Sequence, residues 1–212
     1  GNASEKLPQR MSFHKSCECK VARCLHCVYT AIRRQAGLRS GFSILDEQDV
    51  EQLLQELAKK NDADKAALQR ARAQISTWKN DLIDPDQASR TAEDDQSAFH
   101  AALYGAYQRA LRAYNAVDFD DLILLPTILF ENNPDILKKW QNTIHYLLVD
   151  EYQDTNSSQY LLVKQLVGLR SGLTVVGDDD QSIYAWRGAK PENLAQLQQD
   201  FPGLKLVKLE QN

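Results

Sequence analysis

Two apolar runs in this sequence end abruptly in carboxylates. Tyr146–Val149 is followed by Asp150 and Glu151, and Leu173–Val176 is followed, after one glycine, by three consecutive aspartates. A buried parallel strand that ends in this way delivers charge to the carboxyl edge of a sheet, where α/β proteins bind their ligands. There Asp150 could hold a phosphate-bound Mg²⁺, and Glu151 could orient or deprotonate an attacking water. The pattern favours nucleotide hydrolysis; the alternative is a strand end capped by solvated acids.

The residues after the second run favour contact with a nucleic acid. Gln181 follows the three aspartates, and Tyr184, Trp186 and Arg187 then supply two aromatic rings and a cation. Stacking on such rings accepts every base and contributes roughly 1–3 kcal/mol per base, which suits a protein that moves along any sequence. The alternative for both rings is a place in the core. Together the two runs are typical of a nucleic-acid motor.

These residues stand in two long and specific strings. Residues 150–156 read Asp-Glu-Tyr-Gln-Asp-Thr-Asn, and residues 175–189 read Val-Val-Gly-Asp-Asp-Asp-Gln-Ser-Ile-Tyr-Ala-Trp-Arg-Gly-Ala. In this order and spacing they resemble motifs II and III of superfamily 1 DNA helicases of the UvrD/PcrA/Rep group, with the Rep branch nearest. Residues 117–123 match a further family motif, and residues 208–212 resemble the lead-in to motif IV. The similarity runs over about residues 41–212.

The resemblance implies a role for each of these residues. Asp150 would hold Mg²⁺, Glu151 would be the catalytic carboxylate of ATP hydrolysis, and Gln181 would sense the γ-phosphate or its water. Three neighbours would contact DNA: Tyr184, Trp186 and Arg187. For the arginine, a phosphate contact and a pair with a motor-domain carboxylate both stay open. For Asp120 and Asp121, a capping role and a DNA contact both stay open.

The resemblance also implies an α/β fold class and an order of domains. Residues 118–212 would form the second half of the first RecA-like helicase motor domain, with part of the parallel sheet of a P-loop NTPase. Residues 41–117 would form an α-helical insertion subdomain. Residues 1–40 match the family poorly, and we expect about the first 30 not to be native family sequence, through a reading-frame error, a divergent gene end or an added leader.

The function implied for a longer parent is ATP-dependent 3′–5′ movement on single-stranded DNA and at duplex junctions, with ATP and Mg²⁺ as cofactors. A P-loop would read Gly-x-x-x-x-Gly-Lys-Ser/Thr, and none of the nine glycines stands in that pattern. The chain also ends at Asn212, before the arginine with which the family reaches the γ-phosphate. We therefore expect an internal helicase fragment that is inactive by itself.

Two rival functions stay open. A helicase–nuclease subunit shares these motor motifs and adds a nuclease domain, which could lie outside this chain. A non-catalytic, zinc-stabilised interaction module could retain a motor remnant. The missing P-loop favours the second rival, but a dead remnant would not need four intact functional residues. These are Asp150, Glu151, Gln181 and Trp186.

The composition fits a protein that buries a core and does not bind DNA over its whole surface. Hydrophobic residues make up 43% of the chain. A net charge of −4 and a pI near 5.6 leave room only for a groove with local cations. No apolar run reaches membrane-spanning length, and the N-terminus has no apolar secretory segment. We expect a soluble cytoplasmic protein without membrane contact.

Helical periodicity dominates residues 41–117. Apolar residues recur at i, i+3, i+4 and i+7 from Asp46 onward, and further helices are predicted over about residues 64–80 and 95–114. The triplet Asp-Pro-Asp at residues 84–86 is interpreted as a break between two of them. This pattern gives three amphipathic helices without strands.

The segment that follows is predicted to begin with a buried helix. Asp118 is expected to cap it, with Asp121 as the partner in an acidic version of the capping box. Pro126 is expected to kink or end this helix. A short helix is predicted from Pro134.

A strand–helix–strand unit is then predicted, with a right-handed crossover. Its strands are residues 146–149 and 173–176, and its helix opens with the capping pair Asn156 and Gln159. Because other strands of the sheet are missing, an exposed sheet edge is expected. Two further elements complete the segment, a helix over residues 191–199 and a strand over residues 205–209.

All four cysteines lie in one short window: Cys17, Cys19, Cys24 and Cys27. Four soft ligands close together favour zinc, and the Cys-x₂-Cys half is a legitimate knuckle. The Cys-x-Cys half and the short spacer between the pairs oppose it, because little chain remains to wrap around a tetrahedral ion. Reduced, unliganded thiols of an intracellular protein are favoured, with zinc as the alternative.

Overall fold

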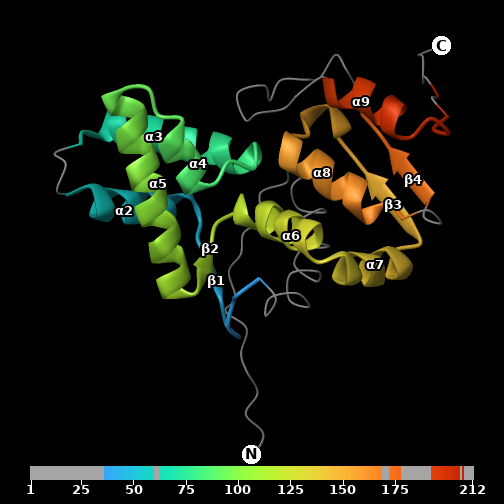
Figure 1. Cartoon of the computed structure of the whole chain (residues 1–212), viewed down its shortest axis with the longest axis horizontal. Coiled ribbons are helices and arrows are strands. Elements are labelled where there is room, and N and C mark those ends of the chain that lie inside the picture. The colour runs from blue at the N-terminus through green and yellow to red at the C-terminus, as the bar shows by residue number, and fades with distance from the viewer. Residues whose placement is uncertain (1–35, 60–62, 169–171, 178–191, 206, 208–212) are drawn as a thin grey trace, which may run out of the picture.

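A computed structural model of the chain describes residues 36–59, 63–168, 172–177, 192–205 and 207. Figure 1 shows two groups of elements, one formed by the blue and green helices and the other by the yellow to red helices and strands. In the described part of the chain, no helix combines the length and the apolar character that crossing a membrane requires.

The first group consists of four helices, and each begins directly after an aspartate. They are α2 (Glu47–Ala58), α3 (Lys65–Asn80), α4 (Pro85–Arg90) and α5 (Asp95–Tyr114). Their N-cap side chains accept hydrogen bonds from first-turn backbone N–H groups; these caps are Asp46, Asp64, Asp84 and Asp94. Each such cap typically contributes about 1 kcal/mol, because it satisfies a donor that the helix leaves unpaired. The predicted helices from Asp46, over 64–80 and over 95–114 are confirmed.

The short helix α4 corrects the prediction of a simple break at residues 84–86. Pro85 occupies the first helical position, where its missing N–H costs nothing and its fixed φ suits a helix. The same triplet therefore ends one segment and begins another helix. The four helices share one apolar core, in which the ring of Trp78 stacks on that of the buried Tyr104 at 5.8 Å between centroids.

Two short strands join the ends of this helical group. β1 (Ser43–Ile44) and β2 (Ala116–Val117) pair in parallel, with Ser43 opposite Ala116. The prediction of a helical unit without strands is thus wrong at its two borders. Strands of two residues carry no periodicity that a sequence pattern could reveal, and they form because the helical group brings its ends together.

The second group packs helices against a parallel pair of strands (Figure 1). Its strands, β3 (Tyr146–Val149) and β4 (Gly172–Val175), pair with Tyr146 opposite Gly172 and Val149 opposite Val175. The predicted strand–helix–strand order is confirmed, and β4 begins one residue earlier than predicted. The remaining elements are α6 (Asp121–Asn132), α7 (Pro134–Thr143), the 3₁₀ turn η2 (Tyr152–Asp154), α8 (Ser157–Leu166) and α9 (Glu192–Asp200).

Three predictions for this group need correction. The helix α6 begins at Asp121 with Asp120 as its N-cap residue, later than predicted, and it continues through Pro126 to Asn132. In the predicted strand over residues 205–209, the described residues Lys205 and Val207 are not in a strand. The reciprocal hydrogen bonds expected between Asp118 and Asp121 are nevertheless present.

The two-stranded sheet is covered on one face only. Val149 packs against Val163 of α8 and Leu197 of α9. The alternate residues of β3, Tyr146 and Leu148, point to the other face because side chains alternate along a strand, and each is 63% exposed. The prediction of a buried strand therefore holds for one face, and the described residues provide no cover for the other.

Candidate active site

The two predicted catalytic carboxylates lie directly after β3. Asp150 is exposed and Glu151 is half-buried. Glu151 adopts a left-handed backbone conformation, with φ 52° and ψ 44°, which is uncommon for any residue other than glycine. The Asp150 carboxylate accepts a hydrogen bond from the Glu151 N–H at 3.1 Å. The chain therefore turns sharply at the carboxyl end of the strand and presents both carboxylates there.

Gln153 holds the side chain of Glu151. Its Nε2 donates to the Glu151 carboxylate at 2.8 Å, and Gln153 is itself 93% buried, with 7% of its surface exposed. The space beside it is closed by Gly177, where a Cβ atom would lie only 2.7 Å from the Gln153 Oε1. The backbone fixes the same neighbourhood, because the Tyr152 N–H donates to the Val176 carbonyl at 2.9 Å. The ends of the two strands thus support the Glu151 carboxylate together.

The carboxylates at this turn suit a hard cation. Burial, and secondarily the negative charge of Glu151, raise the pKa of Asp154, and Asp154 Oδ1 is a buried oxygen without a hydrogen-bond partner among the described residues. The same part of the chain contains no cluster of three or more metal-ligating side chains. Mg²⁺ commonly takes one or two carboxylates and completes its shell with phosphates and water. The exposed carboxylate of Asp150 fits this kind of partial coordination of a nucleotide-bound Mg²⁺.

Several predicted site residues lie outside the described residues. They are Gln181, Tyr184, Trp186 and Arg187 of the second string, and the four cysteines, Cys17, Cys19, Cys24 and Cys27. Their predicted roles remain predictions. Gly177, at the end of the second apolar run, is described and lies against Gln153.

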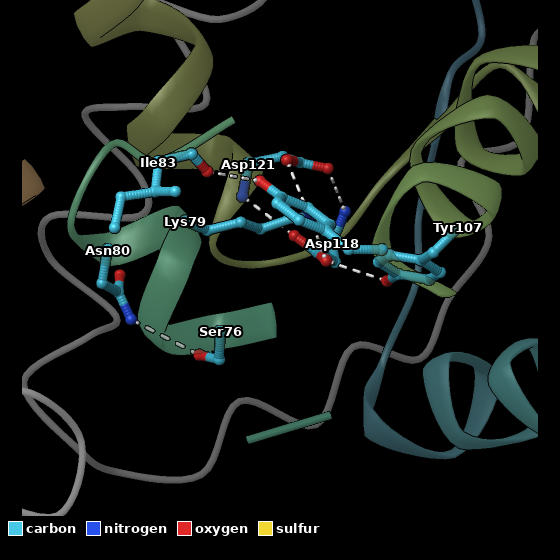
Figure 2. A network of polar contacts seen from close by, with 8 residues as sticks. Ser76, Lys79, Asn80, Ile83, Tyr107, Asp118 and Asp121 are labelled. Atoms are coloured by element: carbon cyan, nitrogen blue, oxygen red, sulfur yellow. Dashed lines mark hydrogen bonds and ion pairs between the residues drawn. The ribbon is translucent and has the colours of Figure 1, made fainter. Parts of the chain in front are cut away.

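A second cluster of carboxylates lies where the two groups of elements meet (Figure 2). Lys79, fully buried at the end of α3, donates from Nζ to Asp118 at 2.6 Å and to Asp121 at 2.8 Å. The Tyr107 hydroxyl donates to the same Asp118 oxygen at 2.8 Å. The backbone N–H groups of Asp118 and Asp121 donate to each other's carboxylates. Each buried charge in this cluster therefore has a partner.

Burial and charge oppose each other in this cluster. Burial alone would lower the pKa of Lys79, but the carboxylates of Asp121 and Asp118 outweigh it and hold the pKa above its usual value. Burial would raise the pKa of Asp118, but Lys79 outweighs it, so this pKa is lowered. Burial and the charge of Asp118 raise the pKa of Asp121 to about 6, and the same two causes raise that of Asp120 to about 6. The single ammonium group of Lys79 thus balances the charge of more than one carboxylate.

This cluster decides between the two roles left open for Asp121. Asp121 is 2% exposed and bonded to Lys79 and Asp118, so its carboxylate serves the interior and not a DNA surface. Asp120 is half-buried. Sequence reasoning missed Lys79 and Gln153. A signal was available only for Gln153, which stands inside the Asp-Glu-Tyr-Gln string.

The sequence profile of the UvrD/REP helicase N-terminal domain matches residues 9–202. The chain therefore belongs to the UvrD/REP helicase family. The matched range includes the two strings at the ends of β3 and β4. It also includes the buried aspartates of residues 117–123.

Individual relatives agree with this assignment. The ATP-dependent DNA helicase Rep of Escherichia coli (strain K12) is 56% identical over 177 residues, which cover 83% of this chain and 26% of that protein. Rep of Salmonella typhimurium is 55% identical over the same shares. The ATP-dependent DNA helicase PcrA of Staphylococcus epidermidis is 41% identical over 186 residues, which cover 85% of this chain and 26% of the relative. The chain thus spans about a quarter of the length of these relatives.

Proposed function

We propose that this chain supplies the hydrolytic carboxylates of an ATP-dependent DNA helicase. The observation that supports this most is the Glu151 turn, in which a half-buried carboxylate is held by Gln153 on a left-handed backbone at the end of a parallel strand. Backbone strain of this kind persists where the surroundings hold it, and it clusters at functional sites. The relatives' names, ATP-dependent DNA helicases Rep and PcrA, agree with that chemistry.

Each residue of the turn has a distinct task in this proposal. Asp150 would hold Mg²⁺ through its exposed carboxylate, and the bound ion would neutralise charge on the nucleotide phosphates. Glu151 orients the attacking water and accepts its proton. Gln153 keeps the Glu151 carboxylate in place. Gln181 follows the end of β4 in sequence and senses the γ-phosphate or its water.

The proposed fold is the second half of a RecA-like motor domain with an inserted helical subdomain. The parallel pairing of β3 and β4, with carboxylates at their carboxyl ends, supports the motor assignment for residues 118–212. The shared core of α2–α5 supports a helical subdomain over residues 41–117. The segment of residues 1–40, which was expected to match the family poorly, is joined to both units at its end, because Leu38 packs in one buried cluster with Val117 and Leu122.

The proposed partner is single-stranded DNA, with duplex junctions as the place of unwinding and 3′–5′ as the direction of movement. Tyr184 and Trp186 would stack on bases, and Arg187 would bind a phosphate or a motor-domain carboxylate. Base stacking without hydrogen-bond readout suits movement along any sequence. We place the longer protein in the cytoplasm, without membrane contact.

A chimera tests this function, since this chain spans about a quarter of its relatives. The matched 177-residue segment of Escherichia coli Rep is replaced by that of this chain, and ATP hydrolysis is measured with and without single-stranded DNA. Glu151→Gln is the test variant. Glu131→Gln, at an exposed position near the end of α6, is the matched control, because it makes the same chemical change away from the turn.

The expected result is a DNA-stimulated ATPase in the chimera that Glu151→Gln lowers by about 10²-fold or more, the range for loss of a general base. DNA binding by Glu151→Gln and hydrolysis by Glu131→Gln should stay unchanged. A folded chimera without ATPase activity, or equal activity in the Glu151→Gln variant, would contradict the proposal.

A further inference from the structure

The end of α3 contacts the motor segment through three consecutive residues. Lys79 bonds to Asp118 and Asp121 at the start of α6. Asn80 Oδ1 accepts a hydrogen bond from Asn156 Nδ2 at 2.9 Å. The last residue, Asp81, accepts one from the Ser157 hydroxyl at 3.3 Å. The helical unit is thus joined to the N-terminus of α8, which lies only a few residues beyond the catalytic turn.

We propose that Asn80 is a positioning residue for Glu151, acting across the boundary between the two units through Asn156. This inference rests on the proposed function and assigns part of that function to the helical unit. In consequence, α3 of the helical unit helps to hold the hydrolytic carboxylate in place.

Asn156 is a fully engaged residue, and this makes it a rigid link. Its Oδ1 accepts hydrogen bonds from the Gln159 N–H and the Ser158 hydroxyl, both at 2.9 Å. Its own N–H donates to Gln159 Oε1 at 3.1 Å. The Nδ2 donor is directed to Asn80, and both asparagine residues are 8% exposed. A buried amide that loses its partner is left with an unsatisfied donor, which is unfavourable, so this geometry resists displacement.

The chain between Asn156 and Glu151 is equally tight. The Asp154 N–H donates to the Glu151 carbonyl at 3.0 Å, and the Thr155 N–H donates to the Tyr152 carbonyl at 3.1 Å. The Thr155 hydroxyl donates to that same carbonyl at 2.8 Å. These bonds link Asn156 to the turn through the intervening backbone, so we expect a shift of Asn156 to displace Glu151.

The ion pairs of Lys79 hold the end of α3, and with it Asn80, in place. Because Lys79 is fully buried between two carboxylates, the end of α3 cannot slide along α6 without separating buried charges. The next residue, Asn80, is therefore presented to Asn156 at a set position. Figure 2 shows Lys79 and Asn80 at the same end of α3, with the Asn80 Nδ2 also bonded to Ser76.

Asn80 is the cleaner position to change, because Asn156 also caps α8. Asn80→Ala in the chimera removes the link and leaves the cap. We expect kcat for ATP hydrolysis to fall about tenfold, while KM for ATP and affinity for single-stranded DNA stay within about twofold. Small misplacements of a catalytic group can cost up to about 10²-fold, and Gln153 still holds Glu151 locally. Asn80→Asp keeps an acceptor for Asn156 and should restore most of kcat.

Asn132→Ala is the matched control, because this exposed asparagine also bonds one helical turn back, to the Ile128 carbonyl. All assays are run well below each variant's thermal midpoint. A purely structural Asn80 would lower that midpoint in Asn80→Ala and leave kcat unchanged, and that result would overturn the inference. An inactive parent chimera, or ATP hydrolysis that persists in the Glu151→Gln variant, would instead contradict the proposed function.

Discussion

The two carboxylate clusters of this protein differ in how their charges are balanced. At the junction, Asp118 and Asp121 share a buried ammonium, and their oxygens accept hydrogen bonds from protein groups. At the turn after β3, Asp150 is exposed, Glu151 is half-buried with one amide partner, and Asp154 has a buried oxygen with no partner among the described residues.

The difference separates a structural use of charge from a functional one. A buried ion cluster contributes stability only when every group is paired, since an unpaired buried charge costs several kcal/mol. The junction meets that condition within the chain. The turn leaves its carboxylates open and holds one of them on a strained backbone, as expected of a site that a ligand completes.

Removing the junction cation should have the largest effect. Lys79→Met leaves Asp118 and Asp121 buried without their partner, and we expect the free energy of unfolding to fall by about 3–5 kcal/mol. Urea unfolding of the chain, followed by circular dichroism, measures it. Lys138→Met, at an exposed position on α7, is the control and should change stability by less than about 0.5 kcal/mol.

Adding Asp118→Asn to Lys79→Met sharpens this test. If the unpaired charge is the source of the loss, the double variant should recover part of the stability of the single one. Equal effects of Lys79→Met and Lys138→Met would show that the ion pairs of Lys79 do not stabilise the junction.

The junction should also respond to pH through Asp121. Its pKa in the folded state, about 6, lies above the ordinary 3.8 of an aspartate, so the folded protein binds this proton more tightly than the unfolded chain does. The resulting stability is fully present below pH 3.8 and is lost as the pH rises through 6. From about pH 4 to pH 7, wild type should therefore lose about 1–3 kcal/mol relative to Asp121→Asn.

Urea unfolding of both proteins across that pH range measures the difference. Asp135→Asn, at an exposed position on α7, is the control and should run parallel to wild type. Parallel curves for Asp121→Asn and wild type would contradict a raised pKa at the junction.

Closing the space beside Gln153 should damage the turn. Gly177→Ala would put a Cβ atom 2.7 Å from the Gln153 Oε1, so the amide that holds Glu151 must shift. In the Rep chimera we expect kcat to fall about tenfold, because the catalytic group loses its alignment. Gly203→Ala, where a Cβ would meet nothing within 4 Å, is the control. Unchanged kcat in Gly177→Ala would mean that Gln153 does not position Glu151.

The smallest expected change in stability comes from Asp154→Asn, and comparing it with Asp118→Asn distinguishes the two clusters directly. Asp154→Asn removes a carboxylate whose charge is disfavoured by burial and by Glu151, so we expect a stabilisation of at most about 0.5 kcal/mol. The same change at Asp118 should destabilise the chain, because it weakens the pairing with Lys79. Urea unfolding of the two single variants compares them. Destabilisation of equal size at both positions would contradict the distinction between the paired carboxylates of the junction and the unpaired ones of the turn.

Local signals account for the parts of the fold and site that were predictable. Asn156 precedes a helix, and its side chain caps that helix as expected, because a cap depends on residues three positions apart. The positions of Asp150 and Glu151 at a strand end followed from an apolar run that stops in acids. The helix α4 was missed because one triplet, Asp-Pro-Asp, both ends a segment and begins a helix.

The sequence by itself determined the long helices of residues 46–114 and the strand–helix–strand order, and it placed Asp150 and Glu151 at a strand end, because each depends on neighbours along the chain. Only the tertiary structure decided which carboxylates are paired with protein groups in the interior and which remain accessible to a ligand. Lys79 lies 39 residues from Asp118 and 42 from Asp121, and Asn80 lies 76 from Asn156. Partners that far apart meet only when two units pack, and burial then decides whether a charge is a structural pair or a site that awaits its ligand.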